Sequence, residues 1–273
     1  MARIESLFRK LDEWKSTLPG TWGLVVEDLQ TGTRWTVNED RLFYAASLIK
    51  VPIMAAVYRE EAAGRLTLEE EWPLSLEDQV GGSGILQHLS PGIRLPIRDL
   101  VTLMIIQSDN TATNMLIRRV GTETIRKTMV ELGMRHSRFH NPLMIVPYPL
   151  ENVNVVTAAD MAACFRRIAR GEAVSLHASR RMIRTLKKQQ DAAGLPSLLP
   201  PKHPEGIVGL QPLWEWAHKT GQVNRILHDA GILYVGGRAL SVTALSEGLD
   251  IRTARSCLGE LGLRAYEWMR EPG

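Results

Sequence analysis

The sequence predicts an α/β lobe built from both ends of the chain, with an all-α lobe inserted between them. Strand-like patterns separated by turn residues occur near both ends, whereas the middle third carries helical periodicity. A Pro-rich passage, residues 194–206, is a plausible crossing point between lobes. We therefore expect residues 1–45 and 195–273 to form the α/β lobe and residues 46–194 the helical lobe, together as one domain.

The first forty residues are typical of a helix followed by a hairpin. Before Pro19 the apolar side chains recur at helical spacing, at Ile4, Leu7, Phe8, Leu11 and Trp14. The runs TWGLVVEDL and TRWTVNED then flank a QTG turn, which predicts two paired strands.

The middle of the chain reads as a series of helices. FYAASLIKVPIMAAVYREE predicts a loop that becomes an apolar helix ending near Gly64. Further helices are expected in IRDLVTLMIIQSD, TATNMLIRRVG and TETIRKTMVELGM, the last with Thr122 as N-cap and Gly133 as its stop. Residues 136–153 contain three prolines and no period, so they predict a long loop. Helices in TAADMAACFRRIARG, capped by Thr157, and HASRRMIRTLKKQQ follow.

The last quarter turns to strands. The runs LWEWAHKTG, ILHDAGILYV and RALSVTALSEG predict three of them, and a closing helix is expected from about Ile251 to Met269. Trp214 and Trp216 are expected in the core.

Composition excludes several classes of function. The 273 residues are 44% hydrophobic and 23% charged, and 33 basic residues nearly balance 30 acidic ones. Nucleic-acid and membrane-surface binding therefore have no support. No apolar run approaches the roughly 20 residues of a membrane helix, and the N-terminus lacks the apolar core of a signal peptide. We expect a cytoplasmic monomer, although a chain trimmed of an export signal would look the same.

Neither a metal nor a cofactor is expected. Cys164 and Cys257 are far apart in apolar, helix-like stretches, which favours buried free thiols. His136 and His140 have the spacing of a helical metal pair, but Pro142 directly beyond them disfavours a helix.

Three short motifs point to chemistry. Ser47 and Lys50 lie three residues apart at the start of an apolar helix, so the lysine can reach the serine hydroxyl. A desolvated lysine beside a second cation would have a lowered pKa and could activate the serine as a nucleophile. By itself such a pair arises by chance about once in a chain of this length.

The other two motifs are much rarer by chance. Ser108-Asp109-Asn110 falls at an irregular junction between helices, where it would more often be a simple N-cap. Lys219-Thr220-Gly221 ends an expected strand, where the glycine lets a ligand approach the backbone and the lysine with the hydroxyl suits a carboxylate.

In this order and spacing the three motifs resemble the signature of the class A β-lactamases and penicillin-recognising serine hydrolases. The resemblance extends over nearly the whole chain. It implies an antiparallel sheet flanked by helices, with an inserted helical lobe.

The resemblance also implies roles for individual residues. Ser47 would be the nucleophile, Lys50 its base and Ser108 the proton carrier to the leaving nitrogen. Substrate would be bound by Asn110, Lys219, Thr220, Gly221 and Gln222. The backbone N–H groups of Ser47 and Gln222 would form the oxyanion hole.

The chain departs from the family in the loop at 136–153. Class A enzymes carry there a glutamate that activates the deacylating water. Counting from the flanking motifs places its position near Leu143 or near Asn141, and neither is acidic. Glu151 is the loop's only carboxylate and a weak candidate for this role, as is His140. Either side chain could instead be merely solvated.

Three functions therefore stay open. The first is a β-lactamase-like hydrolase that is acylated readily and deacylated slowly. The second uses the same chemistry as a D-alanyl peptidase, esterase or amidase. The third is a penicillin-binding protein without turnover.

Overall fold

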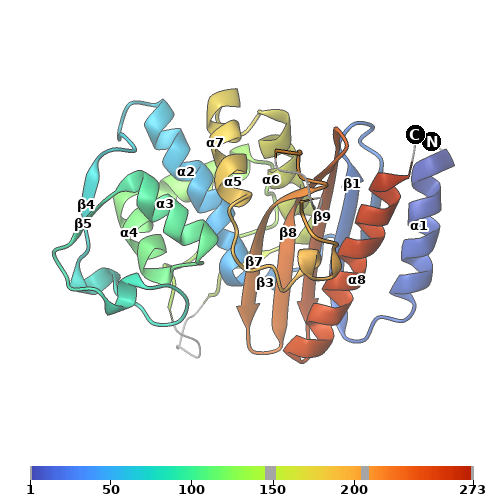
Figure 1. The fold of residues 1–273 in the computed structure, drawn as a ribbon. Helices are drawn as coiled ribbons and strands as arrows, with labels where there is room; N and C mark the ends of the chain where they lie inside the picture. Colours follow the sequence, from blue (N-terminus) through green and yellow to red (C-terminus); the bar gives the residue numbers. More distant parts are fainter. Residues whose placement is uncertain (1, 145–151, 204–208, 272–273) are drawn as a thin grey trace.

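A five-stranded antiparallel sheet stands between two groups of helices in the computed structural model, which describes residues 2–144, 152–203 and 209–271 (Figure 1). The strand order is β2-β1-β9-β8-β7. The bounds of the strands are β1 Thr21–Asp28, β2 Arg34–Val37, β7 Glu215–Val223, β8 Ile226–Val235 and β9 Arg238–Glu247. Both ends of the chain thus build one sheet, as the sequence predicts. The division into lobes at residues 45 and 195 stays a prediction.

Each face of the sheet has its own hydrophobic core. Side chains alternate along a strand, so Leu24 and Val26 of β1 pack on one side while Val25 packs on the other. Helices α1 (Ala2–Lys15) and α8 (Ile251–Arg270) lie side by side over the first face (Figure 1). This arrangement explains the apolar stripe of the N-terminal helix.

The helical middle of the chain covers the second face. Helix α6 (Ala158–Arg170) packs directly against β1, β8 and β9. Helix α2 (Lys50–Ala62) is buried on nearly all sides, which is why its sequence is apolar all round. Around α2 stand α3 (Ile97–Ile106), α4 (Asn110–Val120), α5 (Thr122–Glu131) and α7 (Leu176–Leu186).

Most helix boundaries follow the sequence signals, with one correction. Thr157 caps α6 by accepting a hydrogen bond from the Asp160 N–H at 3.1 Å, and Gly133 follows α5 at a positive φ of 82°. Thr122 is not an N-cap: it is the first residue of α5, and Gly121 with φ of 80° holds the capping position. A glycine can adopt that left-handed backbone more easily than a threonine.

Four short strands in the middle of the chain escape sequence prediction. Strand β3 (Phe43–Tyr44) pairs with β6 (Val155–Val156), and β4 (Glu71–Pro73) pairs with β5 (Arg94–Pro96). Segments of two or three residues are too short to show alternation. The β3–β6 pair matters for function because it ties the loop at 136–153 to the segment just before Ser47.

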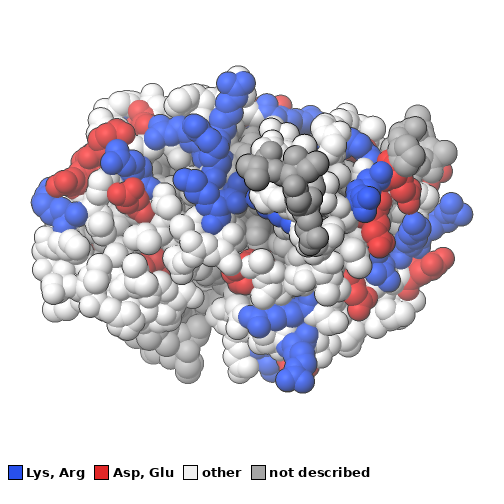
Figure 2. All heavy atoms as spheres, viewed as in Figure 1, with Lys and Arg blue, Asp and Glu red and all other residues white. Residues whose placement is uncertain are grey.

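Both cysteines are free and buried, and burial raises the pKa of Cys164 to about 12. Over the described ranges of the chain, no helix is both long and apolar enough to cross a bilayer. Charges of both signs are spread over the face in Figure 2, with basic side chains gathered around α7. The part of that face over α3 and α4 is mostly uncharged.

Candidate active site

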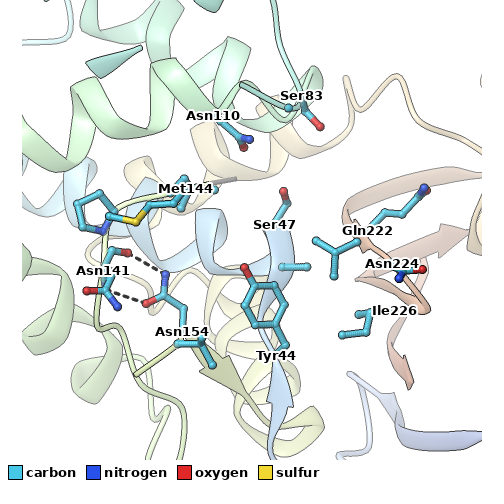
Figure 3. A pocket seen from close by; sticks show the side chains of 16 residues that line it. Tyr44, Ser47, Ser83, Asn110, Asn141, Met144, Asn154, Gln222, Asn224 and Ile226 are labelled. Atoms are coloured by element: carbon cyan, nitrogen blue, oxygen red, sulfur yellow. Dashed lines mark hydrogen bonds between the residues drawn. The ribbon is translucent and has the colours of Figure 1, made fainter. Parts of the chain in front are cut away.

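The nucleophile candidate sits in a tight turn. Ala46–Ile49 form a 3₁₀ helix that runs straight into α2, so Ser47 and Lys50 lie one above the other. Ala46 adopts a positive φ of 44°, a strained conformation for a residue with a Cβ. Ser47 stands at the centre of the cavity in Figure 3, with its hydroxyl pointing toward Asn110 and Ser83.

Lys50 is fully buried and surrounded by oxygen atoms. Its Nζ lies 3.1 Å from Ser47 Oγ, 3.0 Å from Ser108 Oγ and 2.7 Å from Asn110 Oδ1. The Ser108 carbonyl is a fourth acceptor at 2.5 Å. An ammonium has only three N–H donors, so these acceptors compete for it. A neutral amine in the same place would accept a proton from a hydroxyl.

The environment of Lys50 favours the neutral amine. Burial lowers its pKa well below the usual 10.5, the nearby Lys219 lowers it further, and Asp109 partly opposes both effects. The predicted combination of desolvation and a second cation is therefore present.

Ser108 joins the two lysines. Its Oγ accepts hydrogen bonds from Lys50 Nζ and Lys219 Nζ, each at 3.0 Å. Both lone pairs are used in this way, so the hydroxyl keeps its own proton available for donation. Its backbone holds a positive φ of 53°, which turns the side chain into the site.

Asp109, the middle residue of its motif, holds the site together. Its carboxylate accepts hydrogen bonds from the N–H groups of Ile85 at 2.7 Å, Leu86 at 3.0 Å and Ala112 at 2.8 Å. It thus caps α4 and anchors a neighbouring loop. Gly84 in that loop has no room for a Cβ, which would lie 2.2 Å from Asp109 Cγ.

Lys219 lies on β7 and is also fully buried. Its Nζ donates to Ser108 Oγ and, at 2.8 Å, to the Thr220 carbonyl. Burial lowers its pKa to about 8, against the opposing influence of Asp191 and Asp229. Lys219 therefore keeps its positive charge at neutral pH.

The end of β7 touches the serine turn. A Cβ on Gly221 would lie 3.1 Å from Ser47 N, so a larger residue would require the serine turn to move by a few tenths of an ångström. Gln222 follows and lines the cavities on both sides of Ser47. The predicted oxyanion pair of Ser47 and Gln222 thus belongs to two elements in close contact.

Two cavities meet at Ser47. The larger, of about 750 Å³, lies between the loop at 136–153 and the β7–β8 turn (Figure 3). Its described lining contains no charged side chain. The smaller, of about 510 Å³, is bounded by Gln107, Gln189, Gln190, Asp191 and Thr220 among others.

Two asparagines hold the loop over the larger cavity. Asn154 Oδ1 accepts hydrogen bonds from the N–H groups of His140 and Asn141, and its Nδ2 donates to the Asn141 carbonyl (Figure 3). Asn114 of α4 accepts a hydrogen bond from the Leu143 N–H at 2.8 Å and donates one from its Nδ2 to the Leu143 carbonyl at 3.0 Å. Asn141 and Leu143, the two positions at which the family's glutamate is expected, both line this cavity.

The weak candidates for deacylation are placed differently. The His140 backbone N–H donates a hydrogen bond to Asn154 Oδ1, and the His140 side chain is not part of the described lining of the larger cavity. Glu151 lies outside the described residues. His136 is exposed, and across the described ranges no cluster of His, Cys, Asp or Glu could hold a metal ion.

Several site residues are absent from the sequence prediction. Asn114 could have been predicted from the sequence, because it lies four residues after Asn110 and so shares its face of α4. Asp191 and Asn154 could not have been predicted, because each lies in an irregular segment with no recognisable motif around it. His218, which directly precedes Lys219 on β7, is buried with its Nδ1 2.8 Å from Asp229 Oδ1.

The fold and this cluster define a class: penicillin-recognising proteins that combine an antiparallel sheet, a helical lobe and a Ser-Lys pair. The sequence model of the family described as "Beta-lactamase enzyme family" matches residues 5–269. The chain therefore belongs to that family.

Individual relatives agree with this assignment. A beta-lactamase from Rhodobacter capsulatus is 30% identical over 118 residues, which cover 43% of this chain and 40% of that protein. A crystal structure of beta-lactamase from Sphaerobacter thermophilus is 30% identical, with a TM-score of 0.86 over 100% of this chain and 98% of that one. PBP-A is 25% identical, with a TM-score of 0.84 over 98% and 97% of the two chains. A leucine-to-glutamate variant of PBP-A is known as an acyl-enzyme complex with penicillin G.

Proposed function

We propose that this protein is an active-site-serine hydrolase that β-lactams acylate at Ser47 and that releases the acyl group slowly. The observation that carries the proposal is the position of Lys50. Its buried Nζ, with a strongly lowered pKa, lies 3.1 Å from Ser47 Oγ and 3.0 Å from Ser108 Oγ. The family membership supports hydrolysis as the activity.

Acylation follows from these contacts. Ser47 Oγ attacks the lactam carbonyl carbon while its proton passes to Lys50 Nζ, and the N–H groups of Ser47 and Gln222 receive the developing oxyanion. The carbon–nitrogen bond then breaks. Ser108 gives its proton to the leaving nitrogen and regains one from Lys50. Lys219 stays positive and stabilises the negative charge that develops on Ser108 Oγ as its proton leaves.

Deacylation lacks an evident base. We expect the water to attack from the larger cavity, beside the loop in which the family carries its glutamate, and the described lining of this cavity holds no carboxylate. At one of the two expected positions of the glutamate, Asn114 holds the backbone of Leu143, which offers only an apolar side chain, and at the other Asn141 offers a neutral amide. A positioned general base contributes roughly 10²–10⁴-fold to a rate, so its absence predicts a long-lived acyl-enzyme.

Mass spectrometry with benzylpenicillin tests both halves of the proposal. The intact protein should gain the mass of one penicillin, on the peptide that contains Ser47, and should keep it over many minutes. Ser47→Ala should gain nothing. Rapid loss of the adduct with release of penicilloate would show that another group activates the water. An adduct that is never released would identify a penicillin-binding protein without turnover.

A further inference from the structure

Tyr44 brings a hydroxyl into the larger cavity that acylation does not use. Its side chain lines the cavity, and Figure 3 shows the hydroxyl pointing into the space in which Ser47 stands. Within residues 2–144, 152–203 and 209–271, no group forms a hydrogen bond with Tyr44 Oη. The hydroxyl is therefore available to a molecule that enters the cavity.

The backbone around Tyr44 is held from two sides, so the ring has a fixed place relative to the nucleophile. Tyr44 pairs with Val155 in the β3–β6 ladder, and the Ala45 N–H donates to the Asn154 carbonyl at 2.8 Å. From the side of the large sheet, His228 Nε2 lies 2.8 Å from the Tyr44 carbonyl oxygen.

His228 is suited to hold this carbonyl. The Ser246 N–H donates to His228 Nδ1 at 3.1 Å, so the proton of the neutral ring is on Nε2 and is donated to Tyr44. Burial lowers the pKa of His228 to about 4. The ring is therefore neutral near pH 7, and the anchor between β8 and Tyr44 is present there.

Three amides in the same cavity are already engaged. The side chains of Asn141 and Asn154 bind the backbone of the loop at 136–153. The Asn110 amide accepts from Lys50 and donates to the Gly81 carbonyl. These groups shape the cavity, but their hydrogen bonds are directed at the protein itself.

The Tyr44 hydroxyl has the properties needed to hold a water molecule. Burial raises its pKa above the usual 10.0, so it keeps its proton at neutral pH and can both donate and accept a hydrogen bond. A water is held in place when it has two to four polar partners. For a water beside the acyl carbon of acylated Ser47, Tyr44 Oη and Lys50 Nζ are two such partners.

We propose that Tyr44 is a positioning residue whose hydroxyl holds the water that releases the acyl group from Ser47. The inference rests on the proposed function and deepens it, because it assigns a residue to the slow step.

The step uses groups that acylation leaves ready. Lys50 is neutral in the acyl-enzyme, since it has returned its proton to Ser108. The water oxygen bonds to the acyl carbon while a water proton passes to Lys50 Nζ. The bond between the acyl carbon and Ser47 Oγ then breaks, and Oγ takes that proton from Lys50. Tyr44 orients the water and keeps its own proton throughout.

The test measures acylation and release separately for the unaltered protein, Tyr44→Phe and Tyr266→Phe. Phenylalanine keeps the ring and removes only the hydroxyl. Tyr266 lies on α8 at the other face of the sheet, outside both cavities, so its variant is the matched control. Mass spectrometry follows the adduct with benzylpenicillin and with 6-aminopenicillanic acid, which has the same fused rings without the phenylacetyl group.

We expect Tyr44→Phe to slow the decay of the adduct by about tenfold with both compounds, because the water loses a partner that orients it. The rate at which the adduct forms should stay within about twofold of the unaltered protein, since acylation needs no water in this cavity. A merely structural role would slow both steps, because Tyr44 lies only three residues before the nucleophile. Tyr266→Phe should change neither rate.

Four results would overturn the inference while Ser47 is still acylated. They are equal decay with and without the hydroxyl, an equal loss in both steps, a slower decay with benzylpenicillin alone, and an adduct that neither protein releases over hours. The third would show that Tyr44 contacts the acyl side chain instead of the water. Absence of any adduct from the unaltered protein would overturn the proposed function, and the inference with it.

Discussion

Two buried lysines 3.0 Å from one serine hydroxyl set the chemistry at the scale of single residues. Lys219 lowers the pKa of Lys50, and burial lowers the pKa of both lysines. Their roles in the proposed mechanism are opposite. Lys50 must lose its proton to act as a base, whereas Lys219 must keep its own. Ser108 lies between them, where the proposed mechanism has it pass a proton in either direction.

The acylation rate should therefore have a bell-shaped dependence on pH. It rises as Lys50 is deprotonated, because its pKa lies well below 10.5, and it falls above about pH 8 as Lys219 loses its charge. Stopped-flow acylation between pH 5 and 10 checks this. Lys219→Arg should move the falling limb to higher pH, and a rate that still climbs at pH 10 would contradict the assignment.

Leu143→Glu should convert slow release into turnover. The backbone of Leu143 is held by Asn114, so a carboxylate there would face the acyl group from the larger cavity. We expect deacylation to accelerate by about 10²-fold, measured as decay of the adduct. Leu143→Gln is the matched control without a base and should remain slow. Equal decay in both variants would exclude this position.

The clustering of the proposed catalytic residues was predictable because each lies in a short motif of fixed spacing. Ser47 and Lys50 are one turn apart, and Ser108 and Asn110 open the next helix. Asp191 was not predictable in this way. Its hydrogen bond to Thr220, 29 residues further along the chain, exists only in the folded protein.

At the scale of elements, the junction before α4 organises the site. Asp109 is fully buried and satisfies three backbone N–H groups, from α4 and from the loop that carries Gly84. This network holds Ser108 at its positive φ and directs Asn110 toward Lys50. The sequence indicated a cap at this junction but not the loop that it anchors.

Asp109→Ala should therefore destabilise the protein by about 3 kcal/mol, since it removes a cap and leaves buried N–H groups unpaired. Urea unfolding measures the change. Asp109→Asn should lose less, because its amide oxygen can still accept. Hydrogen exchange should increase first around Ile85 and Leu86, and an even increase over the whole protein would argue against a local anchor.

At the scale of the whole molecule, the sheet requires both ends of the chain. β1 pairs with β9, so the N-terminal hairpin and the C-terminal strands form one surface. The sequence predicted this closure from strand patterns at both ends. It could not predict the close packing of α8 on the segment at Leu195. That packing brings Gly262 against Leu195, and no sequence pattern relates two residues so far apart in the chain.

Gly262→Ala tests that packing. A Cβ on Gly262 would lie 1.8 Å from the Leu195 carbonyl oxygen, so α8 and the segment at Leu195 must move apart. We expect a loss of about 1–3 kcal/mol in the free energy of unfolding, measured by thermal denaturation. Ser256→Ala, on an exposed position of the same helix, is the control and should change stability little.

The proposed mechanism depends most directly on one bond, that between Ser47 Oγ and an acyl group. Time-resolved mass spectrometry after mixing with benzylpenicillin measures it. We expect a single adduct on Ser47 that persists for many minutes and is absent from Ser47→Ala. No adduct on the folded protein at any time, or an adduct on another residue, would contradict it.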